Sequence, residues 1–122
     1  MNKERLLNVA KALWESKNPE KFDMDHHIHH ECGTPACAFG HYAARQDLQD
    51  AFRIVFDGQW RCHWIETTDG KNENVWWDDE CVRKHFDISE KEARMLFFAR
   101  GCGGAKTPVE AAKYIERFVA KH

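Results

Sequence analysis

The sequence lacks a long apolar run. Its first segment, residues 1–14, mixes charged and apolar residues in a helical pattern, and it is too polar for a signal peptide or a membrane-spanning helix. Runs of basic residues are also absent, and the formal net charge is −2 at pH 7, so the chain offers no general attraction to phosphate backbones. We therefore expect a cytoplasmic protein with no membrane partner, for which generic nucleic-acid binding is disfavoured.

Closely spaced cysteine pairs are absent as well. The chain has five cysteines, and no two of them are spaced as Cys-x-x-Cys. An odd number of cysteines without an export signal is typical of reduced thiols and not of a disulfide framework. We therefore interpret the cysteines first as small buried apolar residues. No internal repeat, low-complexity tract or phosphate-loop spacing occurs either.

The composition is that of a globular chain with ample material for a core. Its 122 residues are 43% hydrophobic and include eight Phe and five Trp. A chain of this length buries most of its apolar surface in one core and is too short to divide into two. We expect one globular domain over residues 1–122.

Helix signals occur at five places. Asn2 is a plausible N-cap for a helix over residues 3–16, and Thr34 with Pro35 begins a helix over residues 35–46. Asp78 or Asp79 precedes a short helix that ends near Phe86, and Ser89 with Glu92 forms a capping box at the start of the next helix. Thr107-Pro108 precedes a final helix, whose apolar face contains Val109, Ala112, Ile115 and Val119. The glycines at 101, 103 and 104 predict a flexible connector.

The central residues change to a period of two. Phe52, Ile54 and Phe56 alternate with other residues before Asp57-Gly58, a dipeptide typical of a hairpin turn. Residues 60–64 then predict a second strand, and residues 75–77 a third. The resulting expectation is an α+β fold, a mainly helical single domain of about five helices around a short antiparallel β-meander.

Residues 23–41 concentrate groups that bind metals. On a helix, Cys37 and His41 lie one turn apart, and Cys32 can fold back over the helix start. With a fourth ligand from the histidine run, this set could bind zinc, and we name as candidate ligands His26, His30, Cys32, Cys37 and His41. The alternative, which the missing Cys-x-x-Cys pairs favour, is a solvated histidine run beside buried cysteines.

The same region allows an enzymatic interpretation. A thiol beside a helix N-terminus, at Cys37 or Cys32, can act as a nucleophile when a histidine serves as its base. The required geometry is spatial, so the sequence assigns no catalytic residue. Acidic residues 78–80 could bind magnesium, but helix capping explains their position better. The sequence leaves open whether the protein is an enzyme and favours a non-enzymatic role.

Tryptophans form a second candidate site, in the predicted sheet. Trp60, Trp64, Trp76 and Trp77 could present an aromatic surface to a protein partner, because tryptophan is enriched in binding hot spots. Adjacent residues of a regular strand point to opposite faces, so Trp76 and Trp77 cannot both point inward. The alternative is that this face of the sheet packs on the helices.

The segment Cys32-Gly33-Thr34-Pro35-Ala36-Cys37 resembles a family of small, uncharacterised bacterial and phage proteins with a Cys-Gly-Thr-x-Ala-Cys segment near the N-terminus. The resemblance extends to residues 2–7, to residues 21–24 and to the C-terminal helical segments at 86–97 and 107–118, and it omits residues 47–75. It implies a bacterial or phage setting and no particular activity.

Two hypotheses follow. The first is a small protein-binding module, such as a phage accessory protein that inhibits or modulates a host protein, for example a defence component. The second is a zinc-binding protein or a cysteine-dependent enzyme that uses Cys32, Cys37 and His41.

Overall fold

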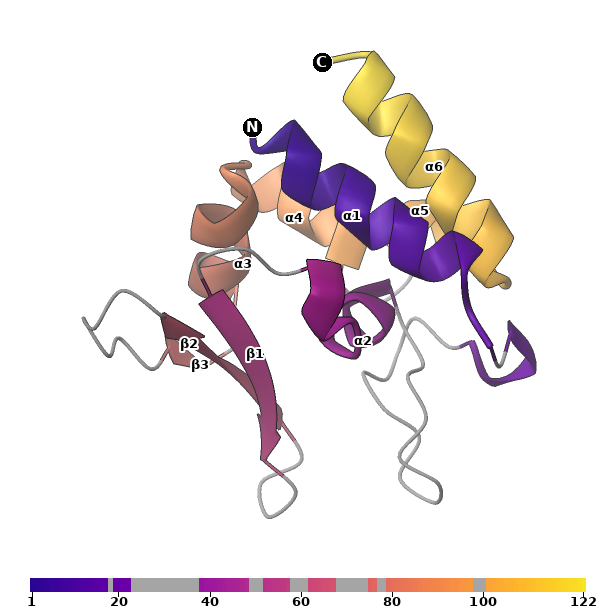
Figure 1. Cartoon of the computed structure of the whole chain (residues 1–122). Helices are drawn as coiled ribbons and strands as arrows, with labels where there is room; N and C mark the ends of the chain where they lie inside the picture. Colours follow the sequence, from indigo (N-terminus) through magenta and orange to yellow (C-terminus); the bar gives the residue numbers. More distant parts are fainter. Residues whose placement is uncertain are drawn as a thin grey trace.

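The computed structural model describes residues 1–17, 19–22, 38–48, 52–57, 62–67, 75–76, 79–97 and 101–122 (Figure 1). Its helices are α1 (Lys3–Trp14), α2 (Ala38–Ala43), α3 (Asp79–Phe86), α4 (Glu90–Phe97), α5 (Gly101–Gly104) and α6 (Pro108–Ala120), with 3-10 turns at Pro19–Lys21 and Gln46–Leu48. The strands are β1 (Phe52–Asp57), β2 (Cys62–Thr67) and β3 (Val75–Trp76). Within these ranges, no helix has the length and apolar character that crossing a bilayer requires.

Side-chain caps begin three of the helices where the sequence predicted them. Asn2 Oδ1 accepts the backbone N–H of Arg5 at 3.1 Å, which satisfies one of the donors that the first turn of α1 leaves without a partner. Ser89 and Glu92 form the predicted capping box, with bonds of 3.0 and 3.2 Å. Thr107 Oγ1 accepts the N–H of Glu110 at 3.2 Å, directly before Pro108. These three predictions are confirmed.

The Thr107 cap gives a first testable prediction. In Thr107→Ala the N–H of Glu110 loses its acceptor, so we expect the free energy of unfolding to fall by about 1 kcal/mol. Thr107→Ser keeps the hydroxyl and serves as the matched control. Urea unfolding followed by circular dichroism measures both. A loss in the serine variant as large as that in the alanine variant would show that the threonine methyl group, and not the cap, is responsible.

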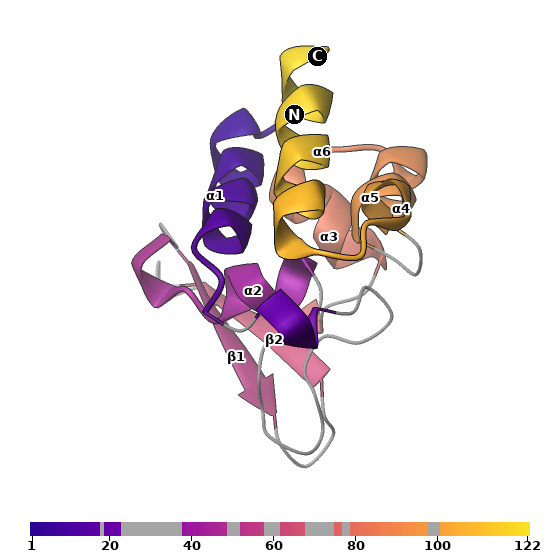
Figure 2. The ribbon, with the colours of Figure 1, turned by 90° about the vertical axis from the view of Figure 1, so that its right-hand side faces the viewer.

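Helices α1 and α6 form the centre of the fold. They lie side by side and run in opposite directions, as two views at right angles show (Figures 1 and 2). Helix α2 packs against α1, and α3 and α4 complete the assembly. The largest fully buried side chains come from these helices: Leu6, Val9, Leu13, Phe39, Tyr42, Phe86, Leu96, Pro108 and Ile115. The apolar stripes of the helices therefore bury one another.

The three strands form an antiparallel sheet in the order β1-β2-β3. Phe52 is paired with Thr67 across β1 and β2, and Ile65 with Val75 across β2 and β3. The sheet lies at one end of the helical assembly and not inside it (Figures 1 and 2). Among the elements that the structure describes, the pairs that pack closely join a helix to a helix or a strand to a strand.

The predicted fold class therefore needs correcting. Of the residues whose backbone and side chains are both described, 76% are helical and none lies in a strand. The described core is supplied by helices and by Ile88 between α3 and α4. An α+β fold with helices arranged around a β-meander does not agree with this distribution. The reason is physical: a period of two predicts extended backbone, but it does not determine which elements bury each other.

Two further expectations are corrected at single residues. Val109, predicted on the apolar face of the last helix, is 39% exposed, whereas Ala112, Ile115 and Val119 are buried. The helix predicted over residues 35–46 is described as Ala38–Ala43: residues 35–37 lie outside the described part of the chain, and the helix ends at Ala43, before the 3-10 turn Gln46–Leu48. Thr34 and Pro35, which predicted the start of that helix, lie in the same excluded range.

Candidate functional site

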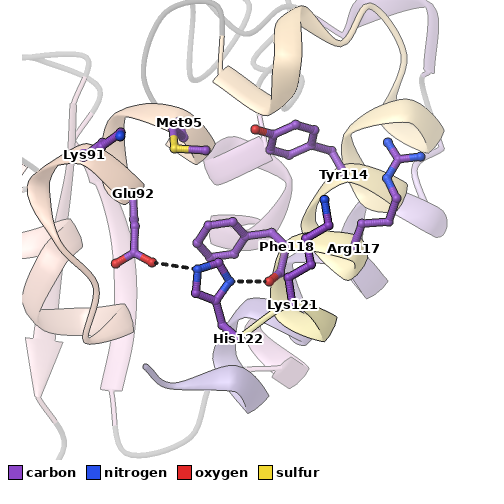
Figure 3. Close-up of a pocket in the computed structure, with 8 residues that line it drawn as sticks. All are labelled: Lys91, Glu92, Met95, Tyr114, Arg117, Phe118, Lys121 and His122. Atoms are coloured by element: carbon purple, nitrogen blue, oxygen red, sulfur yellow. Dashed lines mark hydrogen bonds and ion pairs between the residues drawn. The ribbon is translucent and has the colours of Figure 1, made fainter.

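A hollow of about 550 Å³ lies between α4 and α6 (Figure 3). Helix α5 packs against both α4 and α6, whereas α4 and α6 are not among the pairs of described elements that pack closely on each other. We call this hollow the α4–α6 groove. Its walls come from Lys91, Glu92 and Met95 on α4, and from Tyr114, Arg117, Phe118, Lys121 and His122 on and directly after α6.

Helical periodicity gathers these side chains on facing surfaces. Lys91 and Met95 are four residues apart on α4, and Tyr114 and Phe118 are four residues apart on α6, so each pair shares one helix face. Figure 3 shows the α4 residues on one side and the α6 residues on the other, with the Tyr114 ring reaching toward Met95. The groove is therefore built by two regular helices and not by loops.

The floor of the groove is apolar. Phe118 is 7% exposed and belongs to the core, and its ring lies 4.4 Å from the His122 ring, measured between centroids. Tyr114 is half-buried against the same core, and Met95 is 38% exposed. Methionine adapts its shape to a contacting surface, and a tyrosine combines an apolar ring with a polar hydroxyl. This floor can accept an apolar side chain of a ligand.

The rim of the groove is basic. Lys91, Arg117 and Lys121 are exposed, and in the described part of the chain none of the three forms an ion pair with a carboxylate. Against these three cations the lining holds one carboxylate, Glu92. A positive groove on a chain of net charge −2 is a local departure from the overall charge. It favours an anionic ligand.

Glu92 is held in its charged form. Its Oε1 accepts the backbone N–H of Ser89 at 3.0 Å, and this bond is the main reason why the pKa of Glu92 lies below its ordinary value of 4.5. The Ser89 side chain and His122, whose Nε2 lies 3.6 Å from Glu92 Oε2, lower that pKa further. The carboxylate therefore offsets part of the positive charge of the rim at neutral pH.

This pKa gives a second prediction. Because the folded-state pKa of Glu92 is lowered, its charge stabilises the fold above pH 4.5, and this stabilisation is lost as the pH falls through the folded-state value. We expect the wild type to exceed Glu92→Gln in free energy of unfolding at neutral pH, and the difference to vanish in acid. Urea unfolding of both proteins as a function of pH measures it. A difference that is independent of pH would contradict the assignment.

The α5 turn fixes the position of Tyr114. Gly103 has a φ of 66°, and a Cβ at this residue would meet Tyr114 Cε2 at 3.1 Å. A left-handed backbone and a close approach to the ring both require glycine here. A second hollow of about 370 Å³ is lined by Cys102, Gly103, Ala105, Glu110, Lys113, Tyr114 and Arg117. Tyr114 and Arg117 line both hollows.

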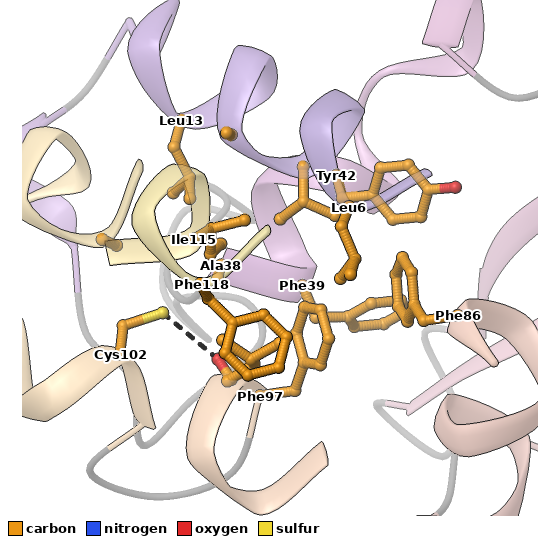
Figure 4. Close-up of a cluster of buried hydrophobic side chains, with 14 of the residues drawn as sticks. Leu6, Leu13, Ala38, Phe39, Tyr42, Phe86, Phe97, Cys102, Ile115 and Phe118 are labelled. Atoms are coloured by element: carbon orange, nitrogen blue, oxygen red, sulfur yellow. Dashed lines mark hydrogen bonds between the residues drawn. The ribbon is translucent and has the colours of Figure 1, made fainter. Parts of the chain in front are cut away.

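The predicted flexible connector at the glycines is corrected by the same turn. Gly101 and Cys102 are buried, and Cys102 Sγ donates a hydrogen bond to the carbonyl oxygen of Leu96 at 3.3 Å (Figure 4). The segment packs against α4 and α6 instead of linking them loosely. Cys102 also agrees with the interpretation of the cysteines as small buried residues.

Of the predicted zinc ligands, the structure describes one. His41 lies in α2, is 6% exposed, and has its Nε2 2.9 Å from Ser16 Oγ, with the Phe22 ring centroid 5.9 Å from its own. The other four, His26, His30, Cys32 and Cys37, lie outside the described residues. Among the described residues, no group of three or more histidine, cysteine or acidic side chains is arranged to hold a metal ion. The zinc site stays a prediction.

The predicted tryptophan surface is described only in its backbone. Trp64 in β2 and Trp76 in β3 are directly paired across the two strands. Trp60 and Trp77 lie outside the described residues. The structure thus brings two of the four positions together in the sheet, and the binding role of the tryptophans stays a prediction.

A buried polar cluster joins α1, α2 and α3. His85 Nε2 lies 3.0 Å from Tyr42 Oη, and Arg5 Nη1 lies 3.3 Å from His85 Nδ1 and donates to the His85 carbonyl oxygen at 2.9 Å. A guanidinium can only donate, so in the contact between Arg5 Nη1 and His85 Nδ1 the imidazole nitrogen is on the accepting side. Tyr42 is fully buried and His85 is 7% exposed, so this cluster tethers the helices and offers no surface to a ligand.

The sequence did not single out the residues of the α4–α6 groove. Cations at exposed helix positions are ordinary, and the pattern of Tyr114 and Phe118 is that of any half-buried helix face. One available signal is the repeat of Lys113, Arg117 and Lys121 every four residues, which places three cations in one row along α6. Finding the groove requires knowing that α4 faces this row.

Relatives give no independent guide to the site. The family resemblance noted in the sequence rests mainly on residues 32–37, which lie outside the described part of the chain. The C-terminal segments that share in it form α4 and α6, the two walls of the groove. Compared with models of protein families, with curated proteins and with solved structures, the chain matches none of them.

Proposed function

We propose that this chain is a non-enzymatic, cytoplasmic protein-binding module and that its partner binds in the α4–α6 groove. The observation that supports the proposal is the combination of exposed cations without ion pairs, Lys91, Arg117 and Lys121, with an apolar floor of Phe118, Tyr114 and Met95. Arginine, tyrosine, phenylalanine and methionine are among the residue types enriched in protein interfaces, whereas lysine is typical of their rims and of the remaining surface. The volume of about 550 Å³ is in the range of ligand sites.

The rigidity of the walls also supports binding. Both sides of the groove are helices with satisfied caps, at Ser89 for α4 and at Thr107 for α6. Glycine at 103 allows the Tyr114 ring to lie directly against the α5 turn. A surface that is ordered before binding loses less entropy when the partner arrives, so more of the contact energy appears as affinity.

The experiment that tests the proposal is photo-crosslinking from within the groove. A photoreactive benzophenone amino acid replaces Met95, and a matched control carries it at Leu7, which is exposed to a similar degree (44% against 38%) but lies on α1. After irradiation in bacterial lysate, we expect a discrete adduct from position 95 and none from position 7. The same adduct must disappear when Lys91→Glu and Lys121→Glu are combined in the probe protein.

Three results would count against this proposal. Equal adducts from both positions would mean nonspecific capture. An adduct that survives the charge reversals would mean that the basic rim does not contribute. If a probe placed at Trp76 gives the adduct and one at Met95 does not, the partner binds the sheet, as the tryptophan hypothesis predicts.

The biological role that we propose follows from the resemblance to bacterial and phage proteins. We propose that the partner is a bacterial host protein, such as a defence component, whose activity falls when the groove is filled. Mass spectrometry of the adduct formed by the probe at position 95 identifies that protein. Its activity is then measured with the wild type and with the charge-reversed variant, and equal inhibition by both would refute this role.

A further inference from the structure

A second hollow lies beside the α4–α6 groove. It is lined in part by α5 and shares Tyr114 and Arg117 with the groove, so the two hollows are neighbours along α6, and we call them together the channel. Its two parts are about 550 and 370 Å³. Tyr114 and Arg117 lie where the two hollows adjoin. A ligand that contacts both hollows must extend past these side chains, so the channel suits an elongated ligand better than a compact one.

The cations along this channel have a regular spacing. Lys113 and Arg117 on α6 and Lys121, its C-cap residue, follow one another every four residues, which separates their Cα atoms by about 6 Å along the helix axis. In an extended peptide, every second residue points the same way, and such residues are roughly 6.5–7 Å apart. Carboxylates at alternate positions of an extended peptide therefore match the row of cations.

The acids of the channel distinguish a peptide from a nucleic acid. Glu92 is fixed by the Ser89 N–H, and Glu110 Oε2 accepts the N–H of Lys106 at 3.1 Å, so both carboxylates are held in place. A nucleic-acid strand carries a charge at every phosphate and would have to pass both of them. A peptide can place an uncharged residue opposite each acid. Nucleic-acid binding also draws its affinity from many phosphate contacts, and three cations in a row supply few.

On these grounds we infer that the groove accepts an extended peptide segment of a partner protein, with acidic residues at alternate positions and apolar residues between them. The acidic residues pair with Lys113, Arg117 and Lys121 on the α6 side, and an apolar residue between them points the opposite way, toward Met95 on α4. The inference rests on the proposed function and specifies the chemistry of the partner. The match of charge and spacing carries it, together with the apolar floor.

Fluorescence anisotropy with synthetic peptides tests this inference on the full chain. The probe peptide is labelled Gly-Glu-Leu-Glu-Leu-Glu-Gly. Its matched controls are a peptide of the same composition with glutamates and leucines in two blocks, and one with serine in place of leucine. We expect the alternating peptide to bind at least about tenfold more tightly than either control, because both charge register and apolar contact contribute. Lys121→Glu should weaken it by a similar factor.

A labelled ten-nucleotide oligothymidylate is the competing ligand. Tighter binding of this strand than of the alternating peptide would overturn the inference in favour of single-stranded nucleic acid. Equal binding of the alternating and block peptides would contradict the claim that carboxylates at alternate positions match the row of cations. If the Met95 crosslink captures a partner through the basic rim but no acidic peptide binds, this inference fails and the proposed function stands; if both fail, the groove is not a binding site.

Discussion

Replacing Phe86 with alanine lowers the free energy of unfolding by about 3–5 kcal/mol, the largest effect that we expect from a single substitution. Phe86 is fully buried at the end of α3. Its ring stacks on that of Phe97 in α4, with centroids 4.7 Å apart and planes inclined by 14°, and it lies 5.7 Å from the ring of Tyr42 in α2 (Figure 4). Its removal leaves a cavity where three helices meet.

Two controls make this measurement specific. Phe86→Leu keeps most of the buried volume and should cost less than about 1.5 kcal/mol. Val109→Ala removes an apolar side chain that is 39% exposed, and it should change stability by no more than about 0.5 kcal/mol. Urea unfolding followed by tryptophan fluorescence and by circular dichroism gives all three values. A cost below about 1 kcal/mol for Phe86→Ala would mean that the helices do not meet at this ring.

Reversing the charge of Arg117 weakens partner binding by about 10- to 100-fold, the largest effect that we expect on function. Arg117 lines both hollows, is exposed, and pairs with no carboxylate in the described residues. In Arg117→Glu an acidic partner segment loses an attraction and meets a repulsion. Glutamate and arginine have similar helix propensities, and exchanging a cation for an anion in the last turn of α6 costs only about 1 kcal/mol through the helix dipole, so the chain should stay folded. Isothermal titration calorimetry measures the affinity for the partner that the crosslinking probe at position 95 identifies.

The matched control for this substitution is Lys3→Glu. Lys3 is an exposed cation in the first turn of α1, where a glutamate agrees with the helix dipole, and it lies outside the groove. It changes the net charge of the chain by the same amount. If Lys3→Glu weakens binding as much as Arg117→Glu, the effect is one of overall charge, and the groove has no special role.

Local interactions explain which parts of the fold were predictable. The caps at Asn2, at Ser89 with Glu92, and at Thr107 depend on residues at most three positions apart, and the sequence alone indicated each of them. The period of the apolar residues after Thr107-Pro108 also predicted the burial of Ala112, Ile115 and Val119 on α6, although not the exposure of Val109.

Other parts depended on contacts that are distant in sequence. Trp14 shares the helical pattern of α1 but is 46% exposed, and its Nε1 donates to Glu116 Oε1 of α6 at 2.7 Å. The glycines at 101–104 looked like a loose connector, and burial of Cys102 made them a packed turn. The alternating pattern of the strands could not show that the described core would be helical.

The candidate site was the least predictable feature. The residues that the sequence emphasised, histidines 26–30 and the tryptophans, were chosen by residue type, because metals and partners favour those types. The groove is lined by common residue types. Its basic rim and apolar floor result from the way in which α4 and α6 face each other. Lys91 and Met95 on α4 line a groove only because that helix lies opposite Tyr114 and Arg117 of α6, and α5 packs against both helices.

The most direct test of binding in the α4–α6 groove is a nuclear magnetic resonance titration of the methionine methyl groups. The chain has three methionines, Met1, Met24 and Met95, and substitution of each by leucine assigns the three signals. Met95 is 38% exposed in the groove, whereas Met1 packs against the core at the start of α1. On addition of the captured partner, we expect the Met95 signal to shift or broaden and the Met1 signal to stay unchanged. A Met95 signal that remains fixed while the partner binds would contradict the account.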